Sequence, residues 1–365
     1  MQSHRRLTKR NLAWSLVLPL TPIVALIAAV LLTQQGQTLS DNPVNEPDQP
    51  LIGMHVPWAI GGPAIERDGS LSMRAPEYPD FPIESVRLWD TRTAWLNLES
   101  RQDRWDFTNL DAHIAQAKDH GVTDITLVLW GTPSWAARDI RATDAPWLGP
   151  GSASMPQQIS DWQDYVTHVV TRYKGQINAY EIGNEPNSIN FWSGTDQELV
   201  DLVHVAAATI HQIDPAATVV APAPVFTSKD RKTLRAGTKY WSELDQGEGI
   251  DALSFHWYPS ATTDPSELEK VVAFLRARAQ AAGLEGIPLW LTEVNYYAGT
   301  MSAAQQVNKV IDTNQVINEL KLPRAYWYAW TDLGPLELMQ FGPNTPAEQG
   351  FIASVEGDSM PPASN

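Results

Sequence analysis

Eight short apolar segments, separated by stretches with helical periodicity, constrain the fold of this chain more than any other feature. This alternation is typical of βαβ units around a parallel sheet, and eight such strands close a barrel. We therefore predict an α/β fold, a single (β/α)8 TIM barrel, over residues 51–355. Its strands are expected at residues 51–56, 84–89, 124–130, 177–182, 217–221, 251–255, 288–292 and 325–330.

Signals for helix starts lie between these strands. Thr195 with Glu198, and Ser302 with Gln305, fit the capping box, in which the two side chains satisfy free backbone N–H groups at a helix start. Residues 57–83 are different, because they are rich in Gly and Pro and show no apolar period. We expect irregular structure there.

The N-terminus predicts a membrane anchor. Residues 1–11 include four basic residues, at positions 5, 6, 9 and 10, and are expected to form a cytoplasmic tail. Residues 12–32 contain no charged residue, and this segment is long enough for a transmembrane helix. Residues 33–50 are polar and form an expected flexible linker, and residues 356–365 an expected disordered tail. The 51–355 domain would then be extracytoplasmic, periplasmic or at the cell surface, and secreted if the N-terminal segment is a cleaved signal peptide.

Composition narrows the partners. A net charge of -16 and a sequence pI near 4.8 argue against nucleic acid, since phosphate binding requires clustered Lys and Arg. The chain has no cysteine, so it has neither a disulfide framework nor a thiolate zinc site. The eight histidines show no metal-binding spacing, and phosphate-cradling glycine motifs are missing from the sequence. We therefore expect no cofactor and no metal, and we favour a monomer.

Two glutamates follow predicted strands at positions suited to catalysis. Glu185 lies in Asn184-Glu185-Pro186, just past the fourth strand, and Glu293 follows Thr292 at the end of the seventh. Glu181 shares parity with Glu185, but Glu185 is the better candidate because it lies beyond the strand end. Two carboxylates at one end of a barrel are what glycosidic bond cleavage needs. One protonates the leaving oxygen, and the other meets the positive charge that develops on the sugar.

Aromatic side chains in the loops at that end are candidates for stacking on sugar rings. Trp135 lies in the long loop after the third strand, and Trp330 ends the eighth. An aromatic face attracts the polarised C–H groups of a sugar. The alternative for most of the 15 Trp residues is packing in the core or between helices and barrel.

The segment 180–187 together with Thr292-Glu293 resembles glycoside hydrolase clan A, the retaining glycosidases built on (β/α)8 barrels. Other segments are most like family 39, which includes β-xylosidases, iduronidases and bacterial enzymes that act on exopolysaccharides. They are residues 53–55, ending in His55 on the first strand, 86–90 on the second, 131–136 after the third, and 172–175 before the fourth. The resemblance covers about residues 51–355.

The resemblance implies roles for individual residues. Glu185 would be the general acid/base and Glu293 the nucleophile, and Asn184 would hold the 2-hydroxyl of the substrate. The other implied substrate-binding or orienting residues are His55, Arg87, Trp135, His256, Tyr258 and Trp330, with Trp330 as the floor under the reactive sugar and Tyr258 in contact with the nucleophile. Gly183 departs from the family, because relatives often carry Trp there, so no substrate can be copied from them.

We predict a retaining glycoside hydrolase that acts on a polysaccharide or oligosaccharide. One alternative is a membrane-tethered barrel that binds polysaccharide without cleaving it. Another is an exo-acting β-glycosidase or a transglycosidase. The presence of both glutamates with Asn184 and Tyr258 favours an enzyme, because a receptor has no need for two carboxyls of opposed protonation.

Overall fold

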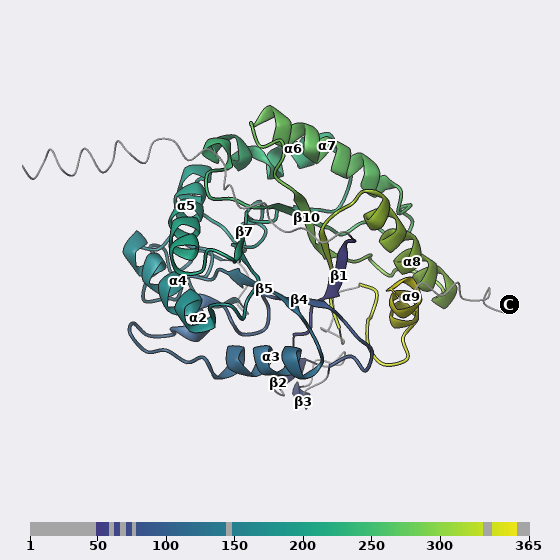
Figure 1. Ribbon diagram of the computed structural model, residues 1–365, viewed down its shortest axis with the longest axis horizontal. Coiled ribbons are helices and arrows are strands. Elements are labelled where there is room, and N and C mark those ends of the chain that lie inside the picture. Colours follow the sequence, from purple (N-terminus) through teal and green to yellow (C-terminus); the bar gives the residue numbers. More distant parts are fainter. Residues whose placement is uncertain are drawn as a thin grey trace, which may run out of the picture. The chain divides into compact units, whose positions relative to one another are not determined.

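Nine parallel strands form one curled sheet in the computed structural model, with helices packed around its outside (Figure 1). The structure describes residues 49–57, 62–65, 71–74, 78–143, 148–330 and 338–355, with backbone alone for 62–65 and 71–74. All of these belong to the unit formed by residues 42–365. The arrangement is a TIM-barrel-like α/β fold.

Neighbouring strands of the sheet are mostly consecutive in the chain, in the order β7-β6-β5-β4-β1-β11-β10-β9-β8. The sheet closes on itself, because Val220 of β7 forms a parallel bridge with Ala252, just before β9. The backbone N–H of Ala221 also donates to the carbonyl of Ala252 at 2.8 Å. The strands are β1 (Leu51–Met54), β4 (Ser85–Leu88), β5 (Asp124–Leu129), β6 (Ala179–Ile182), β7 (Thr218–Val220), β8 (Val225–Phe226), β9 (Leu253–Trp257), β10 (Leu289–Val294) and β11 (Arg324–Trp327).

Helices cover the outer face of the sheet and shield its apolar side chains. The α-helices are α2 (Trp95–Leu98), α3 (Thr108–Asp119), α4 (Ile159–Tyr173), α5 (Asp196–Ile213), α6 (Arg231–Gly237), α7 (Glu267–Ala281), α8 (Ala303–Glu319) and α9 (Pro346–Val355), and the 3-10 helices are η2 (Lys239–Glu243) and η3 (Asp245–Gly247). Both predicted capping boxes are confirmed, with Thr195 at the start of α5 and Ser302 at the start of α8.

The main core lies between the sheet and these helices. All six residues of β5 are buried, as expected for a strand covered on both faces. Val166, Val169 and Val170 on one face of α4 pack into the same core. Because the strands are parallel, their carboxyl ends all lie at the same rim of the sheet, where the loops carry polar side chains.

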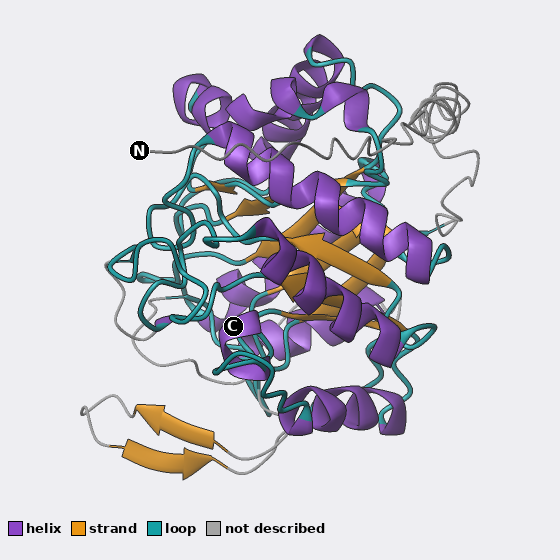
Figure 2. Ribbon diagram, turned by 90° about the vertical axis from the view of Figure 1, so that its left-hand side faces the viewer, coloured by secondary structure: helices purple, strands orange, loops and turns teal. Residues whose placement is uncertain are grey.

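Three local features differ from the sequence prediction. The fifth predicted strand is observed as β7, and an additional two-residue strand, β8, follows it and pairs with β9. The regular part of the eighth ends at Trp327 and not at residue 330, although the backbone N–H groups of Tyr328 and Trp330 still donate to the carbonyls of Val294 and His55. The segment expected to be irregular contains an antiparallel pair, β2 (Gly62–Ile65) and β3 (Leu71–Arg74), which Figure 2 shows side by side. Two four-residue strands are too short to give a readable period.

The predicted tail, transmembrane segment and most of the linker, residues 1–48, lie outside the described residues, as does the predicted C-terminal tail 356–365. Among the helices of the described residues, none combines the length and apolar character needed to cross a bilayer.

Candidate active site

Arg87 on β4 is the centre of the polar cluster at the carboxyl rim of the sheet. Its side chain is fully buried. Nε donates to Oε2 of Glu181 and Nη1 to Oε1 of Glu293, each at 2.6 Å, and Nη2 donates to Oδ1 of Asn184 at 3.1 Å. One guanidinium thus fixes three side chains, from β6, the loop after it and β10, which suits its planar set of donors.

Glu293 reaches this cluster through a bulge in β10. The pairing of β10 with β9 runs from Leu291 opposite Phe255 to Glu293 opposite His256, so Thr292 is an extra residue. A bulge changes the direction in which the next side chains point. Thr292 accordingly donates to Oε1 of Glu181 at 3.2 Å, while Glu293 meets Arg87 and accepts a hydrogen bond from the Tyr258 hydroxyl at Oε2. Both oxygens of Glu293 therefore have donors.

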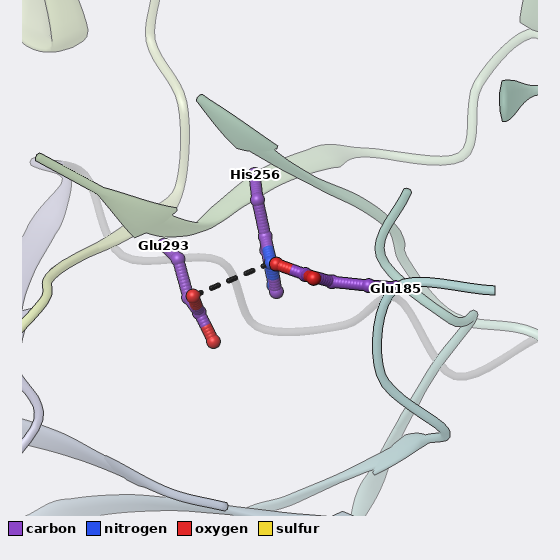
Figure 3. A group of neighbouring side chains, drawn as sticks. All are labelled: Glu185, His256 and Glu293. Carbon is purple, nitrogen blue, oxygen red and sulfur yellow. Dashed lines mark hydrogen bonds and ion pairs between the residues drawn. The ribbon is translucent and has the colours of Figure 1, made fainter. Parts of the chain in front are cut away.

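Glu185 approaches from the loop after β6, where its backbone has a positive φ of 41°. Its Oε1 lies 3.0 Å from Nδ1 of His256, and the same nitrogen lies 3.4 Å from Oε2 of Glu293. One carboxylate oxygen of each glutamate and a nitrogen of His256 all lie within 4.8 Å of one another. Figure 3 shows the three side chains pointing toward a common point from three segments of the chain.

The two glutamates have different electrostatic surroundings. Burial raises the pKa of Glu185 well above its ordinary value, and the negative charge of Glu293 raises it further. Burial also raises the pKa of Glu293, but Arg87 and the Tyr258 hydrogen bond oppose this, so that it reaches only about 7. Glu185 therefore keeps its proton at a pH where Glu293 is ionised. One protonated and one ionised carboxyl are what an acid and a nucleophile in the same site require.

Both histidines of the cluster are held neutral. Burial lowers the pKa of His256 well below its ordinary value, and the positive charge of Arg87 adds to this effect. The same two causes, in the same order, lower the pKa of His55. His55 Nε2 lies 3.4 Å from Arg87 Nη1 and 3.2 Å from the carbonyl oxygen of Thr292. His55, which directly follows β1, thus contacts the guanidinium, and His256 is an uncharged imidazole with a hydrogen bond to Glu185.

Seven of the predicted residues therefore meet in one cluster: His55, Arg87, Asn184, Glu185, His256, Tyr258 and Glu293. Trp330 and Trp135 lie elsewhere. Trp330 is 1% exposed and packs edge-on against Phe81, with ring centroids 5.4 Å apart. The ring of Trp330 lies in the main core, while its backbone N–H donates to the carbonyl of His55 at 2.8 Å. Its role as the floor under the sugar stays a prediction.

Trp135 is also a packing residue in this structure. Its ring lies edge-on to Trp95 at 5.9 Å, and its indole N–H donates to the carbonyl of Glu99 at 2.8 Å. Both neighbours belong to the segment of helix α2, outside the sheet. The fold thus uses the indole nitrogen, while the side chain is only partly buried, and substrate binding by Trp135 stays a prediction.

Tyr328 is a further aromatic side chain beside the cluster, which the sequence analysis did not single out. It directly follows β11, and its ring lies edge-on to His55 at 5.0 Å and to Tyr258 at 6.2 Å. Its hydroxyl donates to Oδ2 of Asp90 at 2.7 Å. Sequence reasoning also missed Asp90 and Glu181 as members of the cluster. Their signal was present, because Asp90 directly follows the second predicted strand and Glu181 shares parity with Glu185.

The same cluster has the spacing of a metal site, since Glu185, His256 and Glu293 each offer one ligand atom within 4.8 Å of the others. The hydrogen bonds and ion contacts described above already use these atoms. The arrangement therefore fits acid–base and nucleophilic chemistry better than metal coordination.

Comparison with known proteins places this chain in a family. Residues 93–333 match the family model described as Cellulase (glycosyl hydrolase family 5). The chain belongs to this family. The resemblance to clan A glycoside hydrolases is thereby confirmed, and the relatives include family 39 enzymes.

A Beta-xylosidase from Geobacillus stearothermophilus is 32% identical to this chain over 192 residues, which cover 45% of this chain and 35% of that enzyme. The family 39 glycoside hydrolase from Bacteroides cellulosilyticus WH2 shares the fold with a TM-score of 0.60 at 15% identity, over 84% of this chain and 64% of that one. The structure of GH10 from Paenibacillus barcinonensis shares it with a TM-score of 0.56 at 16% identity, over 78% of this chain and 90% of that one. This chain thus spans about a third of the length of the curated relative that it matches.

Proposed function

We propose that this chain is a retaining glycoside hydrolase that cleaves O-glycosidic bonds by double displacement, with Glu293 as the nucleophile and Glu185 as the general acid/base. One observation carries the proposal. Two carboxyls, that of Glu293 buried and that of Glu185 partly buried, approach within 4.8 Å of each other, and their surroundings push them to opposite protonation states. Retaining enzymes hold their carboxyls roughly 5 to 5.5 Å apart, whereas inverting enzymes need about 6.5 to 9.5 Å to admit a water.

In the first step, an oxygen of Glu293 attacks the anomeric carbon while the bond from this carbon to the leaving oxygen breaks. Glu185 gives its proton to that oxygen, so the aglycone leaves as an alcohol. Arg87 and Tyr258 keep Glu293 ionised and aim its free lone pairs. The product of this step is a covalent glycosyl ester on Glu293 with Glu185 now ionised.

In the second step, Glu185 removes a proton from a water that attacks the anomeric carbon from the side the aglycone left. The ester bond to Glu293 breaks, and both carboxyls return to their initial states. Nδ1 of His256 contacts both glutamates, so it stays in contact with whichever of the two is ionised at each step. Asn184, fixed by Arg87, would bind the 2-hydroxyl of the sugar in both steps.

We propose a β-linked polysaccharide or oligosaccharide as the substrate of the (β/α)8 barrel. Xylosides are the first to test, because the curated relative is a Beta-xylosidase. Trimming from the chain end, transglycosylation, and binding without cleavage remain the alternatives to cleavage within a polymer.

The test incubates the purified protein with 4-nitrophenyl β-glycosides and polysaccharides and identifies the first anomer released by NMR. We expect the β-anomer. Glu293→Ala should abolish turnover and keep the thermal unfolding transition, and azide added to Glu185→Ala should restore activity by giving the β-glycosyl azide, since azide needs no general base. Release of the α-anomer would refute retention, and binding without turnover in the wild type would support a receptor.

We also propose that the protein is anchored in a membrane with this domain outside the cytoplasm, supported by the uncharged residues 12–32 after a basic tail. Protein expressed from the full sequence should stay with the membrane pellet after washing at alkaline pH. Release into the supernatant would contradict anchoring.

A further inference from the structure

Five buried polar atoms around the two glutamates have no hydrogen-bond partner among the described residues. They are Nδ1 of His55, Nε1 of Trp89, Oδ1 of Asp90, Nδ2 of Asn184 and Nε2 of His256. Buried polar atoms are nearly always paired in folded proteins, because each unpaired one loses its bonds to water without replacement. Such a concentration at one site indicates groups kept for a polar ligand.

Asp90 is the carboxylate in this set. It follows β4 directly, and its Oδ2 accepts the hydrogen bond from Tyr328 at 2.7 Å, which leaves Oδ1 as the unpaired oxygen. Tyr328 lies within electrostatic reach of three acidic groups, because burial first and then the charges of Asp90, Glu293 and Glu185 raise its pKa. Asp90 therefore lies at the rim of the catalytic cluster on the Tyr328 side.

The charge of Asp90 is poorly compensated. Arg87 is the cation that influences it, but Arg87 already binds Glu181, Glu293 and Asn184. Burial raises the pKa of Asp90 to about 6, with the Tyr328 hydrogen bond opposing the rise. At neutral pH this is a carboxylate with one unused oxygen. A role as a brace for Tyr328 explains Oδ2 but not Oδ1, and a neutral amide could hold the tyrosine as well.

We propose that Asp90, held by Tyr328, binds a 3- or 4-hydroxyl of the glycone through Oδ1 and makes the site select neutral sugars over uronic acids. This inference rests on the proposed function and names its substrate class. A sugar hydroxyl donates a charge-assisted hydrogen bond to the carboxylate, whereas a sugar carboxylate would be repelled by it and by Glu293. The net charge of -16 opposes anionic substrates in the same direction.

The first experiment pairs a substrate change with a protein change. Values of kcat/KM are measured for 4-nitrophenyl β-xyloside and its 3-deoxy and 4-deoxy forms with wild type and Asp90→Ala. For one of the two deoxy forms, the wild type should lose about 10- to 100-fold relative to the parent, as expected for a hydrogen bond to a charged group. Asp90→Ala should lose little or nothing further on that form. Equal losses in both proteins for both deoxy sugars would overturn the assignment, even if Asp90→Ala is slower throughout.

The second experiment tests the charge. The 4-nitrophenyl β-glucoside and β-glucuronide differ only at C6, and Asp90→Asn keeps the size of the side chain. We expect Asp90→Asn to raise the glucuronide-to-glucoside ratio of kcat/KM at least 10-fold. Glu99→Gln is the matched control, since Glu99 is a buried carboxylate bonded to Trp95 at 2.8 Å in the helical shell, and it should leave the ratio unchanged. An unchanged ratio in Asp90→Asn would refute selection by charge.

The outcomes separate this inference from the hydrolase proposal. If the wild type cleaves none of these glycosides, calorimetry with methyl β-xyloside, methyl β-glucoside and methyl β-glucuronide still compares binding to the wild type and Asp90→Asn. If the wild type binds the neutral sugars more tightly than the glucuronide, and Asp90→Asn loses this preference, the inference is retained and the hydrolase proposal is rejected. Turnover by the wild type with no effect of Asp90 in either experiment would retain the hydrolase and remove the inference.

Discussion

Removing the Tyr258 hydroxyl should shift the pH range in which the enzyme works. This hydroxyl donates to Oε2 of Glu293, while Arg87 occupies Oε1 at 2.6 Å. Tyr258→Phe deletes one donor and keeps the ring, which packs with Trp89 and Tyr328 in a small apolar cluster. The change therefore acts on the charge of Glu293 more than on the fold.

The magnitude follows from the loss of one hydrogen bond to a carboxylate. Such a bond is worth about 1.5–3 kcal/mol, and one pKa unit corresponds to about 1.36 kcal/mol, so the pKa of Glu293 should rise by roughly one to two units. The wild-type pKa is about 7, and the nucleophile must be ionised. Activity is lost as pH falls through this pKa. Tyr258→Phe should therefore move the acidic limb of the pH profile of kcat/KM to higher pH and narrow the pH range of activity.

The assay is the pH dependence of kcat/KM on an activated aryl glycoside between about pH 5 and 10, because this parameter reports ionisations of the free enzyme. Tyr296→Phe is the matched control: Tyr296 is a fully buried tyrosine whose hydroxyl lies 2.9 Å from Oγ1 of Thr313, away from the carboxyls. It should cost about 1 kcal/mol of stability and leave the limb in place. An acidic limb that stays fixed or moves down in Tyr258→Phe would refute the stated role of the hydroxyl.

Three further predictions concern stability. The pKa of Glu185 is raised in the folded state, mainly by burial, so its protonated form stabilises the fold at low pH, and this contribution is lost as pH rises through the folded pKa. Glu185→Gln should therefore raise Tm over wild type more at pH 9 than at pH 5. An equal gain in Tm at both pH values would contradict this. Asp124→Ala removes a buried partner 2.7 Å from Arg324 at the amino end of the sheet and should cost about 3–5 kcal/mol in urea unfolding, with kcat of the folded enzyme unchanged. Gly183→Ala places a side chain at φ 86° and should cost about 1–2 kcal/mol and lower activity; an unaffected urea midpoint would show that the turn before Asn184 adapts.

The fold class and most strand positions could be predicted because they depend on local patterns. A buried parallel strand is a short apolar run, and the run at residues 124–130 has the same character whichever strands flank it. The capping boxes at Thr195 and Ser302 are equally local, since each involves residues three positions apart. The additional strand β8 was missed because it is defined by its pairing with β9 and not by its own two residues.

The site divides in the same way. The sequence by itself determined that two glutamates follow strands ending at one rim, because parallel strands must deliver their carboxyl ends together. Only the tertiary structure decided that Arg87 lies between Glu181 and Glu293, that a bulge at Thr292 turns Glu293 toward Tyr258, and that Tyr328 faces the site while Trp330 enters the core. Bulges, strand ends and side-chain directions depend on the register with neighbouring strands, and that register is fixed by contacts between residues far apart in the chain.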